Sequence, residues 1–352
     1  MKMSHRAVSG LIRTLTIIGI ASVAFADRSA AAAQRIDLKP LRIEVPGDRN
    51  LQFINLWVAV GAGFFHEEGL APEIEVASEP RTVGNMLLKG DADVALLPPP
   101  MYLGMMAESK PIQLFASLLA NEPINLVVRK DIADARGLSA RASLRERMLA
   151  IKGLKIGLAG EVAPRLRAIA TRAGMDSAKD FQLTVVPGPA QVKAFADKRV
   201  DALFAHTPYL ETALVDYGGV LLVQTSGGEV PELADGQIHA LATTQAEAKN
   251  KPELIAAVTR AIYRAEQLIH SDPKATVEAL IASGVAKDRQ MLEATAAVYG
   301  PAVPQTPKIS LAGIERDVEL YPAHPRAPDF TRVRLADFVA AQFAEQAVAA
   351  KR

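Results

Sequence analysis

The chain has 352 residues, of which 49% are hydrophobic and 22% are charged, so it is long enough to bury one large core or two smaller ones. It contains no cysteine, which excludes disulfides, thiolate metal sites and a cysteine nucleophile. The charges nearly cancel, with 40 Lys and Arg against 39 Asp and Glu. There is therefore no electrostatic case for binding nucleic acid or an anionic membrane.

Residues 1–26 have the pattern of a secretory signal peptide. A basic leader precedes the apolar run LTIIGIASVAFA, and Ala24-Phe25-Ala26 fits a small-x-small cleavage site before Asp27, with a second site before Gln34. The apolar run is too short to span a bilayer comfortably. We expect an exported, soluble protein of the periplasm of a Gram-negative cell. Without a lipid-attachment cysteine it is expected to be free rather than anchored.

The next hundred residues alternate between predicted strands and helices. A flexible tail is predicted over 27–39. One long helix is predicted over 51–69, where apolar residues recur at spacings of three and four. Strands are predicted on either side of this helix and further along, at 41–45, 73–77, 92–97 and 112–119. This alternation predicts βαβ units and a mostly parallel sheet.

The segment GDADVALLPPPMYL, residues 90–103, combines a buried strand with a proline corner and the start of a helix. Pro98 to Pro100 lack backbone donors, so they end the strand, and a proline suits the first turn of the helix predicted over 99–109. The corner lies at the carboxyl end of a strand, where open α/β sheets bind ligands. Met101 and Tyr102 would then either face a pocket with a stiff proline wall or join the core.

A second block of similar rhythm follows, and the chain then becomes helical. The second block has predicted strands at 125–130, 154–160, 181–188 and 200–205. From about residue 238 the predicted helices include 251–271, 288–299 and a C-terminal one within 335–350, separated by proline-rich loops. The sequence thus predicts two α/β blocks and a helical C-terminal part.

Three phrases in this order resemble the periplasmic solute-binding proteins of ABC importers, in the branch that binds nitrate, taurine, aliphatic sulfonates and thiamine precursors. They are GFFHEEGL, LLKGDADVALLPP and VPGPAQVKAFADKRVDALFAHTPY. The resemblance implies an α/β fold of the type II periplasmic-binding-protein class. Lobe 1 would contain 40–125, lobe 2 would contain 126–235, and 236–352 would complete lobe 1. It further implies a small-molecule ligand held in the cleft by hinge closure, delivery to the transmembrane subunits of an ABC permease, no cofactor, no catalysis and a monomer.

The predicted ligand-binding residues lie in turns after strands of both lobes. They are Asn50, Gln52, Glu79, Arg81, Pro99, Met101, Tyr102, Asn121, Gly160, Glu161, Arg165, Gly188, His206, Thr207 and Tyr209. Alternatives stay open for several of them. Asn50 either caps a helix or, with Gln52, lies where the free backbone N–H groups of the first turn favour an anion or an acceptor. Glu79 and Arg81 either contact ligand or pair with each other.

Two departures from the sulfonate-binding members bear on the ligand. Those members have Gly-Ser where this chain has Gly160-Glu161, and a Trp-Asp-Pro-aromatic run where this chain has His206-Thr207-Pro208-Tyr209. A carboxylate at Glu161 would repel an anion unless Arg165 neutralises it or the side chain faces solvent. The ligand is therefore either a sulfonate-like anion or, favoured by Glu161, a neutral to cationic compound with an apolar or heterocyclic part.

Other functions are less well supported. The remaining histidines, among them His66, His239 and His270, have no ligand spacing, so no metal site is predicted. Thiamine-pyrimidine synthases resemble these binders in fold, but a signal peptide argues against such cytosolic chemistry, and no Ser-His-Asp or G-x-S-x-G arrangement is present. A sensor-associated protein that presents its ligand to a receptor is a further alternative to transport.

Overall fold

The computed structural model describes residues 38–47, 50–79, 82–320, 330 and 333–350. The predicted signal peptide and the predicted tail up to residue 37 lie outside these ranges. Lys39 belongs to the first strand, where it is paired with Leu70, so the tail boundary predicted at residue 39 is wrong. None of the described helices has the length and apolar character needed to cross a membrane.

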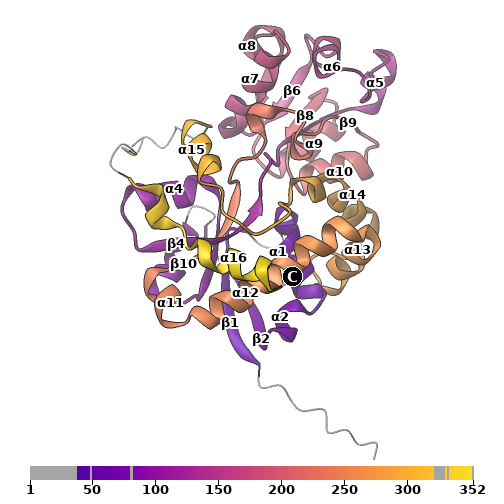
Figure 1. Cartoon of the computed structure of the whole chain (residues 1–352). Coiled ribbons are helices and arrows are strands. Elements are labelled where there is room, and N and C mark those ends of the chain that lie inside the picture. The colour runs from indigo at the N-terminus through magenta and orange to yellow at the C-terminus, as the bar shows by residue number, and fades with distance from the viewer. Residues whose placement is uncertain (1–37, 48–49, 80–81, 321–329, 331–332, 351–352) are drawn as a thin grey trace, which may run out of the picture. The chain divides into compact units, whose positions relative to one another are not determined.

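Two five-stranded sheets define two lobes (Figure 1). The sheet of lobe 1 has the order β2-β1-β3-β10-β4, formed by β1 (Lys39–Val45), β2 (Leu70–Val76), β3 (Val94–Leu97), β4 (Ile112–Leu119) and β10 (His239–Thr244). The sheet of lobe 2 has the order β7-β6-β8-β5-β9, formed by β5 (Asn125–Val128), β6 (Lys155–Leu158), β7 (Gln182–Val185), β8 (Ala202–Ala205) and β9 (Val220–Val223).

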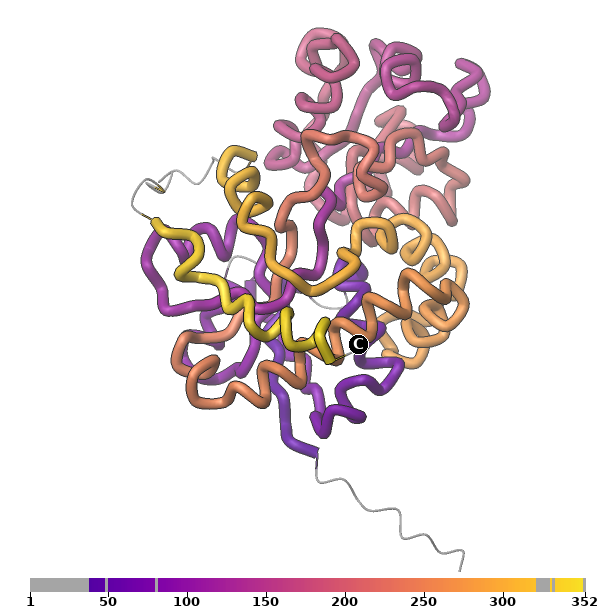
Figure 2. Tube along the Cα trace, in the orientation of Figure 1, coloured from indigo at the N-terminus to yellow at the C-terminus, as the bar shows by residue number. Residues whose placement is uncertain are grey.

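The chain passes between the lobes at residues 120–124 and 224–238, and we call these segments the two crossovers (Figure 2). The first strand after each crossover, β5 or β10, enters its new sheet antiparallel to both of its neighbours, whereas β1–β3 and β6–β8 pair in parallel. The prediction of mostly parallel sheets is therefore correct, and one strand in each sheet runs antiparallel to the others. The crossovers lie side by side, since Gly236 N donates to Ala120 O over 2.7 Å.

The helices of lobe 1 come from both ends of the chain. The early helices are η1 (Leu51–Phe53), α1 (Ile54–Gly61), α2 (Phe64–Glu67), α3 (Asn85–Lys89) and α4 (Pro99–Ala107). The late ones are α11 (Gln245–Asn250), α12 (Pro252–Ser271), α13 (Pro273–Ala282), α14 (Arg289–Tyr299), η6 (Gly300–Ala302), α15 (Leu311–Leu320), η8 (Leu335–Phe338) and α16 (Ala341–Ala349). Among the described residues, no other helix matches the 20 residues of α12, which packs against α1, α13 and α16.

The helices of lobe 2 and of the second crossover are short. They are α5 (Lys130–Ala135), α6 (Leu144–Ala150), η3 (Gly160–Val162), α7 (Ala163–Arg172), α8 (Ser177–Asp180), α9 (Ala190–Ala196) and α10 (Tyr209–Val215), with η4 (Thr225–Gly227) and η5 (Pro231–Leu233) in the crossover. In Figure 1 the group α5–α9 surrounds the labelled strands β6, β8 and β9.

Two predicted helices are interrupted. The helix predicted over 51–69 divides into η1, α1 and α2, because Gly63 adopts a left-handed backbone with φ of 77° between α1 and α2. Its apolar stripe is nonetheless correct, since Leu51, Ile54 and Val58 are buried. The C-terminal helix is likewise divided, into η8 and α16.

The proline corner forms as the sequence predicts. β3 is buried along its whole length and ends at Leu97, and Pro98 then adopts an extended conformation as the N-cap of α4. The carbonyl of Pro98 accepts from the N–H groups of Met101 and Tyr102, at 2.9 and 3.2 Å. The prolines therefore change the chain direction after the strand has ended, so they interrupt no hydrogen bonds between strands.

Candidate functional site

Side chains from both lobes meet where strands of the two sheets end, and we call this group the strand-end site. Lobe 1 contributes Gln52 and His239, and lobe 2 contributes His206 and Tyr209. The two histidines are close enough that the charge of His206 acts on the pKa of His239. Gln52, His206 and Tyr209 were predicted from the sequence as site residues. His239 was not, because its isolated position at the start of β10 carries no motif.

His239 is a buried imidazole in a mixed polar and aromatic setting. Its Nε2 lies 2.9 Å from Gln52 Oε1, and the ring of Phe53 stands edge-on at a centroid distance of 5.4 Å. Burial lowers the pKa of His239 to about 3, and the charge of His206 acts in the same direction. This imidazole is therefore neutral at physiological pH, and its role is hydrogen bonding rather than attraction of an anion.

His206 directly follows β8 and is half-buried. Its Nδ1 lies 2.5 Å from the carbonyl of Thr207, and its ring is tilted by 52° against that of Tyr209 at a centroid distance of 5.7 Å. Burial lowers the pKa of His206, while the Thr207 carbonyl and the charges of Glu122 and Glu161 partly oppose this shift. The ring is therefore mainly neutral at pH 7.

The residues next to His206 shape lobe 2 around it. Thr207 is buried and donates its N–H to Tyr299 Oη over 2.7 Å. Gly188 gives Tyr209 its space, because a Cβ at this position would lie 2.9 Å from Tyr209 Oη. The sequence-predicted Gly188, Thr207 and Tyr209 thus lie together with His206.

A cation and a carboxylate follow β6 near this site, and a second carboxylate reaches them from the first crossover. Arg165 Nε donates to Glu122 Oε2 over 3.0 Å, and its Nη1 donates to the backbone carbonyl of Glu161 over 2.8 Å. Glu122 and Arg165 are only 2% and 6% exposed, whereas the side chain of Glu161, directly after Gly160, is exposed to solvent. Of the alternatives for Glu161, the structure therefore agrees with the one in which its side chain faces solvent. Arg165 forms its ion pair with Glu122.

The residues around the proline corner lie in the core of lobe 1. Tyr102 is fully buried, and its hydroxyl donates to the carbonyl of Gln237 and to Asp317 Oδ2. Pro99 is buried and Met101 packs against the same apolar cluster. The prediction that Tyr102 faces a ligand is wrong for this structure, because helix α4 turns the ring inward. The core alternative describes it instead.

Four further predicted residues have other surroundings. Asn50 caps η1, its Oδ1 accepting from Gln52 N over 2.9 Å, so the capping alternative holds. Asn121 joins the crossovers, since its Nδ2 donates to Ser226 O over 3.1 Å and its Oδ1 accepts from Asp235 N over 3.1 Å. Glu79 is exposed in a turn closed by Thr82, which accepts and donates at the Glu79 backbone. Arg81 lies outside the described residues.

Helix α14 of lobe 1 contacts both lobe 2 and the second crossover through polar groups. Thr295 Oγ1 donates to Glu211 Oε1 over 3.2 Å, and Gln224 Nε2 donates to Val298 O over 3.0 Å. Burial raises the pKa of Glu211 to about 7, so this carboxyl is largely protonated under mildly acidic conditions. Burial likewise raises the pKa of Asp317, near Tyr102, to about 7.

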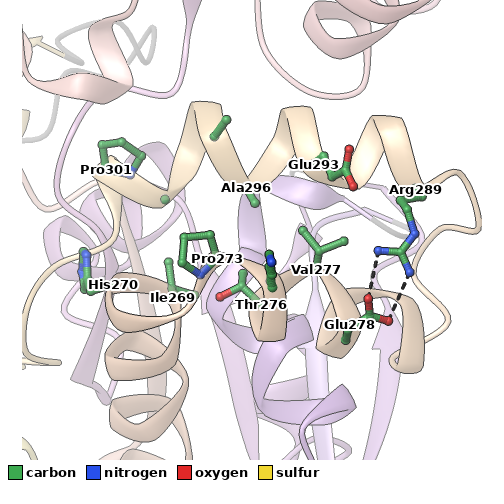
Figure 3. Close-up of a pocket in the computed structure, with 13 residues that line it drawn as sticks. Ile269, His270, Pro273, Thr276, Val277, Glu278, Arg289, Glu293, Ala296 and Pro301 are labelled. Carbon is green, nitrogen blue, oxygen red and sulfur yellow. Dashed lines mark hydrogen bonds and ion pairs between the residues drawn. The ribbon is translucent and has the colours of Figure 1, made fainter.

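A cavity of about 740 Å³ lies apart from the strand-end site, between α12, α13 and α14 (Figure 3). Its walls include the apolar Ile269, Val277 and Ala296, and the ion pair between Arg289 and Glu278 lies at one end. None of the predicted site residues lines it. Among the described residues, no group of three His, Cys, Asp or Glu side chains is arranged to hold a metal ion.

The topology and the strand-end site define a two-lobed periplasmic binding protein fold. Residues 49–283 match the model of the NMT1-like family, and the chain belongs to this family. No curated protein matches it in sequence. The resemblance inferred from the sequence motifs and the predicted fold class are confirmed at this level.

Solved structures with the same fold include binding proteins and an enzyme. The alkanesulfonate-binding protein SsuA from Xanthomonas axonopodis pv. citri, bound to MOPS, shows a TM-score of 0.57 and 17% identity over 85% of this chain and 97% of its own. The nitrate-binding protein NrtA from Synechocystis PCC 6803 shows 0.57 and 16% over 89% of both chains. The desulfurization enzyme DSZB shows 0.55 and 16% over 89% of this chain and 100% of its own.

Proposed function

We propose that this protein is the substrate-binding component of an ABC import system, exported and free in the periplasm. It captures a small organic molecule by closure of its two lobes and delivers it to a membrane permease. The observation that carries the proposal is the strand-end site, to which each lobe contributes polar side chains. A ligand that contacts both Gln52 and His206 stabilises the closed arrangement by its higher affinity for closed over open lobes.

The electrostatics of the strand-end site favour a neutral to cationic ligand with a heterocyclic or apolar part. His206 and His239 are mainly neutral at pH 7, and Arg165 is already paired with Glu122. The rings of His206 and Tyr209 provide stacking surface. A sulfonate-like anion, the ligand type of the SsuA neighbour, is the competing possibility.

A ligand screen tests both the function and the ligand class. Purified protein, refolded to remove carried-over ligand, is heated with amines, neutral heterocycles, pyrimidine precursors, sulfonates and nitrate. A ligand at a hundred times its Kd adds about 2.7 kcal/mol of stability, which is seen as a higher melting temperature. We expect hits among heterocycles or amines, and a sulfonate or nitrate hit would reverse the proposed preference.

Closure of the lobes is measured by fluorescence energy transfer. Because the chain has no cysteine, dyes attach only at introduced ones, such as the exposed K179C in lobe 2 and K249C in lobe 1. A bound ligand is expected to change the transfer efficiency, and a ligand that leaves it unchanged would contradict hinge closure. Loss of uptake of that ligand in a deletion strain separates import from sensing, and unchanged ligand recovered after incubation separates binding from catalysis.

A further inference from the structure

A buried ion pair joins the first crossover to lobe 2 beside the strand-end site. Glu122 lies in the crossover, and Arg165 lies in the first turn of α7, 3.0 Å away between Nε and Oε2. Both side chains are more than nine-tenths buried. Removing one partner of such a pair takes a strong interaction away from a charge in a poorly solvated place, so each partner holds the other strongly.

The pair is electrically part of the strand-end site. The charge of Glu122 acts on His206, which faces the site at the end of β8. Arg165 also binds the carbonyl of Glu161, so its guanidinium is held against the turn that opens η3 and α7. A guanidinium in such a position suits a carboxylate, nitrate or sulfonate, whose oxygens accept two of its hydrogen bonds.

We propose that Glu122 is a built-in counter-ion that occupies Arg165 in place of a ligand anion, and so makes the strand-end site reject small anions. This inference rests on the proposed function, whose ligand class it explains. The exposed carboxylate of Glu161 in the same turn adds negative charge. Glu122 is therefore the residue that determines specificity, and the ligand is neutral or cationic.

The test is rescue of Glu122→Ala by added anions. This variant leaves Arg165 charged, buried and without the Glu122 carboxylate, next to the space that the carboxylate filled. We expect a lower melting temperature than that of the wild type. Acetate, nitrate or methanesulfonate should raise it by about 4 °C at saturating concentration, and each should bind at least tenfold more tightly than to the wild type.

Two controls separate this effect from general salt stabilisation. Glu232→Ala removes the partner of Arg172, which lies on the same helix α7 in a pair of 2.7 Å that is almost half exposed, so anions should give no rescue. The double variant E122A/R165M lacks the guanidinium and should lose the response to anions.

Folded E122A that gains no anion affinity, or E122A/R165M that keeps the response, would overturn the proposal. Saturable binding of nitrate or methanesulfonate to the wild type with a Kd below about 1 mM would overturn it even where E122A fails to fold. If the wild type binds a neutral ligand and E122A gains no affinity for anions, this inference alone is refuted. If the wild type binds no ligand of the screen at all, the proposed function is refuted.

Discussion

Two aromatic side chains predicted for the site, Tyr102 and His206, have different surroundings because of the elements that carry them. Tyr102 lies on the inner face of α4 with its hydroxyl bonded to Gln237 and Asp317, whereas His206 follows a strand end and is half-buried. Tyr102→Phe should lower the free energy of unfolding by about 2 kcal/mol and leave ligand affinity unchanged. The buried carbonyl of Gln237 loses the tyrosine hydroxyl as a donor, and Asp317 Oδ2 keeps the N–H of Gln237 but loses the hydroxyl. Chemical denaturation measures the free energy of unfolding, and titration with the ligand found in the screen measures the affinity.

His206→Ala is the matched opposite of Tyr102→Phe. It should leave the melting temperature of the unliganded protein almost unchanged and weaken ligand binding at least tenfold. A large loss of unliganded stability on replacing His206 would instead place this ring among the core residues, and would contradict its role in the strand-end site.

Glu211 gives the contact between α10 and α14 a dependence on pH. Burial raises its pKa from 4.5 to about 7, so between these values the folded protein holds a proton that the unfolded chain has lost. Stability therefore decreases as pH rises through this range and levels off above about 7. Glu211→Gln keeps an acceptor for Thr295 without the charge.

The measurement is the free energy of unfolding at pH 5 and pH 8. We expect the wild type to lose about 2 kcal/mol more than E211Q over this interval. The exposed Glu253→Gln is the control and should follow the wild type. Equal losses for wild type and E211Q would show that the Glu211 carboxyl ionises in the folded protein as easily as in the unfolded chain.

At the scale of elements, α1 and α13 pack so closely that their contact requires glycine. A Cβ at Gly61 would lie 1.8 Å from Ala279 O and 2.7 Å from Ser283 N, and both are backbone atoms that cannot rotate away. Gly61→Ala should therefore cost about 3 kcal/mol of stability. Gly104→Ala is the matched control, because Gly104 lies in a helix as Gly61 does, but a Cβ there would meet no atom within 4 Å. This substitution should stabilise the protein by up to about 1 kcal/mol. Thermal unfolding of the two variants compares them, and similar effects would contradict the close packing.

The sequence patterns predicted the elements well and the site only in part. Strand β3, the proline corner and α12 follow from local signals: a buried apolar run, missing N–H donors and a period of 3.6. The division of 51–69 depends on one left-handed glycine within an otherwise continuous apolar stripe. His239 is positioned by β10, a strand that reaches lobe 1 only after the second crossover, so no spacing within the sequence links it to Gln52.

At the scale of the whole molecule, one of the buried apolar clusters extends across both lobes. Residues of lobe 2 such as Phe195 and Leu210 belong to the same buried cluster as Tyr299 of α14 and Trp57 of α1. The polar contacts Thr295–Glu211 and Thr207–Tyr299 lie along the same junction. Because unfolding either lobe would expose the shared cluster, we expect both lobes to unfold in one transition. The proposed closure around a ligand would change the angle between the lobes without separating them.

Trp57 makes this cooperativity measurable, because it is the only tryptophan in the chain and is buried in lobe 1. Its fluorescence reports lobe 1, while far-UV circular dichroism reports the helices and strands of both lobes. In urea the two signals should give coincident curves. Leu210→Ala, on the lobe 2 side of the cluster, should shift both by the same amount, about 3 kcal/mol. The opposite result is a variant whose fluorescence midpoint equals that of the wild type while its dichroism midpoint falls at lower urea. It would show that lobe 2 unfolds on its own and that the shared cluster does not couple the lobes.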